Sequence, residues 1–186
     1  MTYRFFTRFS LPLVLGAACL IGLALPLMGC GKGPPHSQAV RTFRTQIQKE
    51  LQRLVPALSE PVATQDKAAI DRALAQSFAQ AEEAGRPPWF RVGVLDPLGT
   101  VLARYPDQEL SGLRFSNYRA VKEVIRKKRV VSQVLYFADH SQAYIILAPL
   151  LSRGKLVGMV GILLNAAEVQ AKWQVSPAEF RQLDFN

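Results

Sequence analysis

Cysteine and histidine are scarce in this chain. Its 186 residues include two cysteines, Cys19 and Cys30, and two histidines, His36 and His140. So few histidines exclude a multi-histidine metal site and a histidine-based catalytic triad. The chain also lacks a Gly-x-Ser-x-Gly nucleophile motif, a phosphate-binding loop and a haem-attachment motif. These absences argue against an enzyme, and we expect no catalytic residue, no metal site and no cofactor.

Acidic residues are absent from the N-terminal region. No Asp or Glu precedes Glu50, and after the basic residues Arg4 and Arg8 the stretch 11–28 carries no charge. A basic start followed by an apolar run is typical of a segment that inserts into a bilayer and keeps its basic end on the cytoplasmic side. Two prolines and a length of 18 residues make this run a poor permanent span, which needs about 20 apolar residues.

The apolar run ends at Leu27-Met28-Gly29-Cys30, which resembles the lipobox of bacterial lipoproteins. The resemblance implies that residues 1–29 are a removed signal peptide and that acylated Cys30 anchors the protein to a membrane. Residues 30–36 would then form a tether. Met28 departs from the small residue usual at its position, and an uncleaved signal anchor or a chance cysteine is the alternative. Because Gly31 is not the Asp that retains such proteins in the inner membrane, the resemblance favours the outer membrane, on the periplasmic face of the cell envelope.

The composition is that of a folded protein. The chain is 49% hydrophobic and 20% charged, which excludes a disordered tail and a low-complexity scaffold. Removal of residues 1–29 would leave 157 residues, enough for one domain that folds without a disulfide or a metal. With Cys30 acylated, no free thiol would remain. We expect one domain over residues 37–172 and a C-terminal capping helix within residues 173–186.

Basic residues are concentrated in one segment. Without Arg4 and Arg8, 21 basic and 14 acidic residues give a net charge of +7, of which residues 114–129 hold +6. No nucleic-acid motif accompanies these charges, and the predicted location outside the cytoplasm also argues against a nucleic-acid partner. An anionic ligand, an anionic membrane or envelope polymer, and a solvated helix face remain open, and the solvated face is the default.

Hydrophobic periodicity predicts two helices at the start of the domain. Apolar residues at three- and four-residue spacing follow Ser37, a suitable N-cap, and predict a helix of about twenty residues that stops in the Pro56–Pro61 region. A second helix is expected to start near Asp66 and to end at Gly85.

The period then changes to two, which predicts strands. The segment Asp96-Pro97-Leu98-Gly99 has the residues of a type I turn between the first two strands. The predicted elements are strands 90–95 and 100–104, a helix 116–128, strands 130–138, 143–149 and 155–164, and a short helix at the capping box Ser176-Pro177-Ala178-Glu179. Short loops require the last three strands to pair antiparallel, with the last of them in the centre. We therefore expect an α+β fold with a single antiparallel sheet, long N-terminal helices on one face and a pocket under helix 116–128 on the other.

This order of elements resembles the Cache (PAS-like) sensor domain, the extracytoplasmic input module of bacterial chemoreceptors and histidine kinases. The resemblance rests on the hairpin Val92–Arg104, on Gly112 with Phe115 and Tyr118, and on Ala148-Pro149-Leu150 with the stretch Gly154–Gly161. It covers about residues 37–172 and implies a small-ligand pocket and a membrane receptor or kinase as partner.

The chain departs from the family in two respects. The amino-acid-binding Cache signature has a Trp two residues after its Arg, whereas Arg114 is followed by Phe115-Ser116-Asn117, so amino-acid recognition is not implied. We also expect no transmembrane segment and no cytoplasmic domain after the sensor. A lipid anchor enters one leaflet only, and the chain is therefore not expected to signal across a membrane by itself.

The candidate ligand-binding residues are Arg114, Phe115, Tyr118, Tyr136 and Tyr144. Arg114 lies four residues before Tyr118 at the start of the pocket helix, and an arginine binds a carboxylate through two parallel hydrogen bonds. Tyr136 and Tyr144 flank the predicted turn 139–142, and rings with a polar tip orient small organic acids. The alternatives are that the tyrosines are core residues and that Arg114 is only a surface charge.

Two other motifs favour structural roles. Arg104 is expected at the surface, at the end of its strand. Asp139-His140 is expected in a solvated hairpin turn, the alternative being a lone pair of metal ligands.

Two functions are consistent with these features. The first is a lipid-anchored extracytoplasmic Cache-type sensor domain that binds a small anionic organic ligand and acts through a membrane partner. The second is an envelope accessory lipoprotein that uses the same fold as a protein-interaction module without a small ligand.

Overall fold

A computed structural model describes residues 37–83, 89–106 and 112–186. The predicted signal peptide, Cys30, the tether and Gly85 lie outside the described residues. The described residues belong to one compact unit with its own core. The elements are α1 (Gln38–Ala63), α2 (Lys67–Glu83), β1 (Arg91–Leu95), β2 (Val101–Tyr105), α3 (Arg119–Lys127), β3 (Val131–Tyr136), β4 (Gln142–Ser152), β5 (Lys155–Asn165), α4 (Ala166–Trp173) and α5 (Pro177–Phe180).

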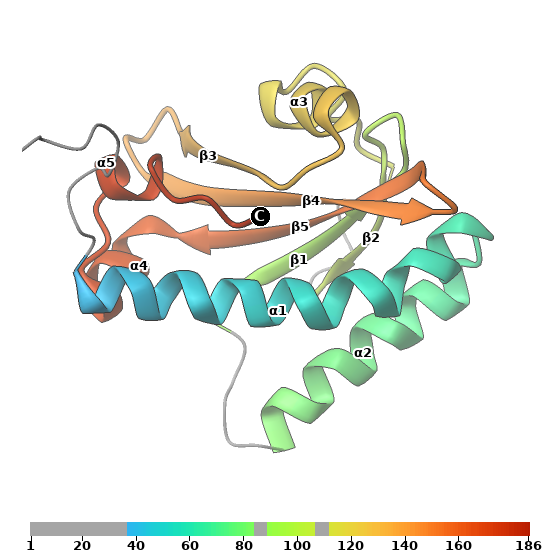
Figure 1. Ribbon diagram of the computed structural model, residues 1–186, viewed down its shortest axis with the longest axis horizontal. Coiled ribbons are helices and arrows are strands. Elements are labelled where there is room, and N and C mark those ends of the chain that lie inside the picture. Colours follow the sequence, from blue (N-terminus) through green and yellow to red (C-terminus); the bar gives the residue numbers. More distant parts are fainter. Residues whose placement is uncertain (1–36, 84–88, 107–111) are drawn as a thin grey trace, which may run out of the picture. The chain divides into compact units, whose positions relative to one another are not determined.

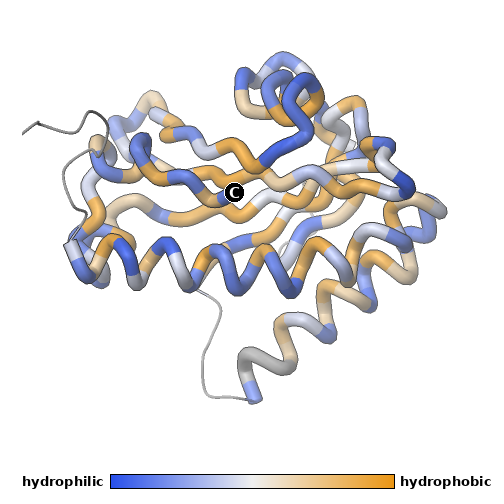
Figure 2. Tube along the Cα trace, in the orientation of Figure 1, coloured by the Kyte–Doolittle hydropathy of each residue, from blue (hydrophilic) through white to orange (hydrophobic). Residues whose placement is uncertain are grey.

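The fold is α+β, with one open antiparallel sheet, as the sequence predicted. The five strands follow the order β2-β1-β5-β4-β3, so β5 is central, which confirms the interpretation of its apolar sequence. Helix α1 crosses one face of the sheet with α2 beside it, and α3 lies over the opposite face (Figure 1). Hydrophobic residues follow the strands, whereas α3 is largely hydrophilic (Figure 2). Among the helices of the described residues, none combines the length and the apolar character needed to cross a membrane.

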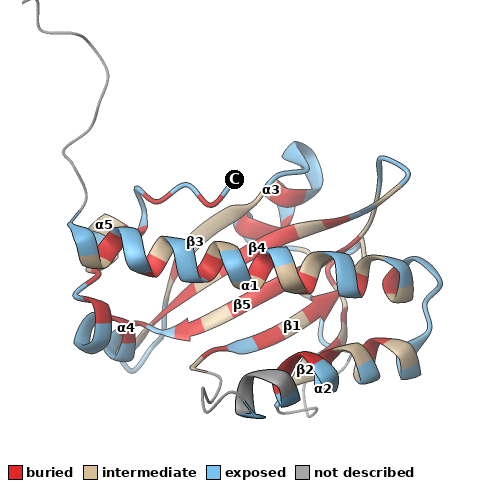
Figure 3. Cartoon of the chain, turned by 60° about the horizontal axis from the view of Figure 1, so that its bottom comes forward, coloured by how far each residue is buried: buried red, intermediate tan, exposed pale blue. Residues whose placement is uncertain are grey.

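Helix α1 begins as predicted and ends later than predicted. The hydroxyl of Ser37 accepts a hydrogen bond from the backbone N–H of Val40 at 3.2 Å and caps the helix. The helix then continues through both Pro56 and Pro61 to Ala63, so the expected stop in this region was wrong. Each proline removes one backbone hydrogen bond, but the buried stripe continues on the same face with Leu58 and Val62, and that burial holds the last turns against the sheet (Figure 3).

The core lies between the sheet and these helices. Alternate residues of each strand enter it, including Val92 and Val94 of β1 and Ile146 and Ala148 of β4. In α2, which the Asp66 side chain caps by accepting from the N–H of Ala69 at 3.0 Å, the buried residues are Ile70, Leu74, Ser77 and Phe78.

The β1–β2 turn has the predicted form. The Asp96 carboxylate accepts hydrogen bonds from the N–H groups of Leu98 and Thr100, both at 2.8 Å. Gly99 has φ +83°, and a Cβ there would lie 3.0 Å from a methyl carbon of Val121 in α3. A glycine is therefore needed both for the turn and for the close approach of α3.

Helix α3 starts at Arg119, three residues later than expected. Tyr118 keeps an extended backbone, φ −70° and ψ 136°, and offers no side-chain cap. Instead, the Gln133 side chain on β3 accepts from the N–H of Ala120 at 3.1 Å. A strand residue thus satisfies a free donor at the start of the helix, which no local pattern reveals.

The C-terminal segment is part of the same core. The capping box at Ser176 and Glu179 is present and begins α5, as predicted. The sequence reading missed α4, which starts after Asn165, whose side chain accepts from the N–H of Ala167 at 2.9 Å. The rings of Trp173, Phe180 and Phe185 surround Phe43 of α1 at centroid distances of 5.6, 6.4 and 6.5 Å.

Candidate ligand-binding site

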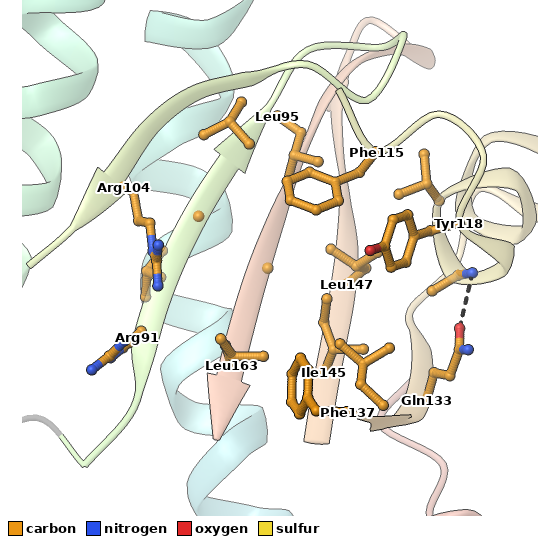
Figure 4. A pocket seen from close by; sticks show the side chains of 17 residues that line it. Arg91, Leu95, Arg104, Phe115, Tyr118, Gln133, Phe137, Ile145, Leu147 and Leu163 are labelled. Carbon is orange, nitrogen blue, oxygen red and sulfur yellow. Dashed lines mark hydrogen bonds between the residues drawn. The ribbon is translucent and has the colours of Figure 1, made fainter. Parts of the chain in front are cut away.

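A cavity of about 410 Å³ lies between the sheet and α3, on the sheet face opposite α1 (Figure 4). Small-molecule sites occupy roughly 300–1,000 Å³, so this volume suits a small ligand. The described residues that line the cavity are Arg91, Val92, Gly93, Leu95, Val101, Arg104, Phe115, Tyr118, Ala120, Val121, Gln133, Leu135, Phe137, Ile145, Leu147, Gly161 and Leu163.

The floor is built from two neighbouring cross-strand rows. In the first row, Arg104 of β2 is paired with Gly93 of β1, Gly93 with Gly161 of β5, and Gly161 with Leu147 of β4. The second row holds Arg91, Leu163, Ile145 and Gln133. Directly opposite residues of paired strands point to the same face of the sheet. Each row therefore begins with an arginine on the β1–β2 side and continues over apolar or glycine positions, and the second row ends at the polar Gln133.

Two glycines lie in the middle of the floor, and one of them leaves open space above it. A Cβ on Gly93 would meet no atom within 4 Å, which means that the missing side chain leaves free space. A Cβ on Gly161 would lie 2.8 Å from the Cδ2 atom of Leu147, so that position is already filled by its neighbour. Glycine inside a strand often marks a place where another group approaches the backbone closely.

Residues of α3 and the segment before it form the roof. The ring of Phe115 contacts that of Tyr118 edge to face, with centroids 5.1 Å apart, and the Tyr118 hydroxyl points toward the cavity (Figure 4). Ala120 and Val121 of α3 close the cavity from above. Because Gln133 lines the cavity and also caps α3, the position of the roof is tied to a residue that a ligand would touch.

The polar groups are unevenly distributed around the cavity. Arg91 and Arg104 lie together at one end, while Phe115, Tyr118 and Phe137 lie toward the other (Figure 4). None of the described lining residues is acidic. Arg104 lies near the end of the edge strand β2, as expected, and its side chain is half-buried. The finding that the sequence did not predict is that this side chain lines the cavity, next to its register partner Gly93.

The structure brings only some of the predicted ligand residues together. Phe115 and Tyr118 line the cavity. Arg114 is exposed, forms an isolated bridge with Thr100, and is not among the lining residues.

Tyr136 and Tyr144 lie on the opposite face of the sheet. Tyr144 is fully buried, stacks on Phe180 at 4.1 Å, and its hydroxyl donates to the carbonyl of Val175 at 3.1 Å. Burial raises the pKa of Tyr144 from 10.0 to about 12. Tyr136 is exposed and accepts a hydrogen bond from Arg181. The structure therefore places Tyr144 in the core, the alternative weighed for it above.

The exposed face of α3 carries paired charges. Glu123 accepts from Arg119 at 2.9 Å and from Lys127 at 2.7 Å. The hydrogen bond from Lys127, followed by that from Arg119, lowers the pKa of Glu123 from 4.5 to about 2. Lys128 donates to the carbonyl of Gly154 at 3.3 Å. This arrangement is typical of a solvated helix face.

The Asp139-His140 motif lies in an exposed turn. Its aspartate accepts from the N–H and the hydroxyl of Ser141 at 3.0 and 2.6 Å, and both bonds lower the pKa of Asp139. His140 has φ +63°, as expected of a tight turn. The structure thus confirms the solvated hairpin turn.

The sequence analysis missed Arg91, Arg104, Gln133 and the two floor glycines. One signal was present. Gly93 and Gly161 interrupt otherwise apolar strands, and Arg91, Gly93 and Leu95 alternate along β1 on one face. This signal identifies the cavity floor only when the strand register is known and when it is known which face of the sheet packs against α1.

Comparisons with solved structures identify similar extracellular sensor domains. The extracellular domain assigned to the histidine kinase vpHK1S-Z8 matches with a TM-score of 0.59 and 15% identity, over 76% of this chain and 57% of that one. A domain of a sensory box/GGDEF family protein from Vibrio parahaemolyticus matches with a TM-score of 0.59 and 14% identity, over 76% and 60%. The ligand-binding domain of the Campylobacter jejuni chemoreceptor Tlp3, in complex with 4-methylisoleucine, matches with a TM-score of 0.56 and 12% identity, over 72% and 55%.

These matches concern the fold. The chain spans less than two thirds of the length of each of these three domains. No protein-family model matches the chain, and no curated protein matches its sequence. With one open antiparallel sheet covered by helices on both faces, the chain has the Cache (PAS-like) fold of extracellular sensor domains.

Proposed function

We propose that this protein is a lipid-anchored extracytoplasmic sensor domain that binds a small organic anion in the cavity under α3 and acts through a membrane receptor or kinase. One observation carries the proposal. The cavity has two arginines at one end, Arg91 and Arg104, and no acidic residue among its described lining residues. Such a site attracts an anion and offers the planar donor geometry that suits a carboxylate.

The proposed ligand contacts differ from those expected from the sequence. Phe115 and Tyr118 are retained as aromatic contacts, and Arg104 with Arg91 replaces Arg114 as the anion contact. Tyr136 and Tyr144 are left out because they lie on the other sheet face.

The proposed location rests on the sequence. Cys30 would carry the lipid, and Gly31 favours the outer membrane on its periplasmic side. A lipid anchor alone transmits no signal across a bilayer, so the proposal includes a membrane-spanning partner. The fold shared with extracellular sensor domains supports a location outside the cytoplasm.

Thermal unfolding in the presence of small organic anions tests the proposal. A ligand at 100 times its Kd stabilises the folded state by about 2.7 kcal/mol and raises Tm by several degrees. We expect a shift with at least one organic anion, loss of that shift in Arg104→Gln, and retention in the matched control Arg114→Gln. Unchanged Tm values across a broad set of organic anions would contradict ligand binding and favour the interaction module.

A further inference from the structure

The two ends of the cavity differ in chemistry. The β1–β2 end presents the guanidinium groups of Arg91 and Arg104 (Figure 4). The opposite end presents mainly apolar side chains, namely Phe115, Phe137, Leu147 and Ile145, together with the ring of Tyr118, whose hydroxyl is the polar group there (Figure 4). A ligand that satisfies both ends must carry its negative charge at one end and an apolar body at the other.

The register defines how far such a ligand extends. Neighbouring strands lie about 4.8 Å apart, so the floor from Gly93 on β1 to Leu147 on β4 is about 10 Å wide. Carbon–carbon bonds of about 1.5 Å give an extended six-carbon chain a length of roughly 6 Å. Such a chain covers the step from β1 to β5 and reaches from the guanidinium end, over Gly93, to the Leu147 side chain, whose Cδ2 atom lies next to the Cβ position of Gly161.

The lining also excludes some classes of charged ligand. An ammonium group needs a carboxylate or several free acceptors, and the described lining residues provide no carboxylate. The side-chain oxygen of Gln133 already accepts from the N–H of Ala120. A second carboxylate at the far end would be placed against Phe115 and Phe137 with no described cation among the lining residues near it. Among the described lining residues, none therefore offers a charged partner to an ammonium group or to a second carboxylate at the far end.

Building on the proposed function, we infer that the ligand is an apolar monocarboxylate of medium chain length. Its carboxylate binds Arg104, with the positive charge of Arg91 beside it, and its hydrocarbon chain lies across the strands over the bare backbone of Gly93, against the Leu147 side chain. The absence of a Cβ at Gly93 allows van der Waals contact between chain and main chain, and makes Gly93 a determinant of specificity.

Four probes of similar length test this inference by calorimetric titration. They are hexanoate, 1-hexanol, norleucine and adipate. The protein is residues 30–186 with Cys30→Ser, which retains the whole compact unit. We expect hexanoate to bind at least tenfold more tightly than each of the other three, because only hexanoate satisfies both ends. Equal or tighter binding of norleucine or adipate would overturn the ligand class while leaving the proposed function intact, and equal binding of 1-hexanol would overturn the role of the arginines. If no organic anion binds at all, the proposed function fails as well.

Two variants test the placement of the ligand. Gly93→Val adds a β-branched side chain at a strand position where a Cβ would meet no atom within 4 Å, so we expect a folded variant with at least tenfold weaker hexanoate binding, and its Tm is measured alongside. Arg104→Gln should weaken hexanoate binding at least tenfold and leave 1-hexanol binding unchanged, since only the charged hydrogen bonds are lost. Arg114→Gln is the matched charge control and should bind hexanoate as the parent does. Parental hexanoate binding by folded Gly93→Val or by Arg104→Gln would overturn the inference.

Discussion

Gly93 and Gly161 lie directly opposite each other in the β1–β5 ladder, so neither residue adds a side chain to the centre of the cavity floor. Their surroundings differ, because only Gly93 has free space where a Cβ would stand. A third glycine, Gly158, has even less space at its Cβ position. A Cβ there would lie 2.5 Å from the Cγ1 atom of Val62 and 2.6 Å from the carbonyl oxygen of Leu95. Within one sheet, Gly93 therefore has open space at its Cβ position, whereas Gly161 and Gly158 are closely packed.

The first prediction compares Gly93→Ala with Gly158→Ala in urea unfolding. Gly93→Ala should raise the free energy of unfolding by about 0.4–1 kcal/mol, because alanine reduces the entropy of the unfolded chain and meets no clash. Gly158→Ala should lower it by about 1–3 kcal/mol, since the backbone of Leu95 cannot move away without disturbing the strand pairing. Equal destabilisation by both variants would show that the space above Gly93 is not free.

The second prediction concerns Tyr144 at alkaline pH. Burial raises the pKa of Tyr144 to about 12, so the fold favours the neutral phenol. Its contribution to stability is complete below pH 10, the ordinary tyrosine pKa, and is lost as the pH rises from about 10 toward 12. Tyr144→Phe removes the hydrogen bond to Val175 and should cost about 1 kcal/mol at pH 8. The Tm difference between parent and variant should shrink above pH 10, whereas parallel Tm profiles from pH 8 to 11.5 would refute this.

The third prediction concerns the cap that Gln133 supplies to α3. Gln133→Met keeps the length of the side chain but removes the acceptor for the N–H of Ala120. The variant should lose about 1 kcal/mol of stability and exchange the amide protons of the first turn of α3 faster, since caps contribute about 0.5–2 kcal/mol. Ser132→Ala, at the adjacent position of β3, serves as the control. Unchanged amide-proton exchange in the first turn of α3 would mean that the Gln133 cap does not stabilise this helix over the cavity.

Much of the fold could be predicted from the sequence, because its signals are local. Ser37, the Asp96 turn and the Ser176 capping box each act within four residues, and all three are present in the structure. The continuation of α1 past Pro56 depends instead on burial against the sheet. The expectation that proline ends a helix considers only hydrogen bonds within the helix and ignores packing against the sheet. It therefore placed the end of α1 too early.

The site was harder to predict, because it depends on register. Alternation along β4 places Tyr144 and Ile145 on opposite faces of the sheet. Which face packs into the core depends on where α1 lies, and alternation does not reveal this. Arg104 likewise lies next to Gly93, which is eleven residues away in sequence and directly paired with it in the ladder. Composition and periodicity contain no information about either pairing.

The fourth prediction concerns membrane attachment. Replacement of Cys30 by Ser should release the protein from the membrane fraction or leave an uncleaved precursor, because Cys30 is the proposed site of acylation. Fractionation with mass spectrometry of the N-terminus measures both outcomes. An unmodified N-terminus at a residue other than Cys30 in the parent protein would rule out the lipid anchor.

The most direct test of the central claim is an amide nitrogen–proton NMR titration of residues 30–186, carrying Cys30→Ser, with hexanoate or another anion that raises Tm. Glycine amides resonate in a distinct region, so Gly93 and Gly161 report from the floor of the cavity, and Gly154, in the exposed β4–β5 turn, serves as an internal control. If the cavity is the ligand site, the signals of Gly93 and Gly161 shift in proportion to ligand bound, while that of Gly154 does not move. Binding of the anion with no shift at either floor glycine would contradict the account.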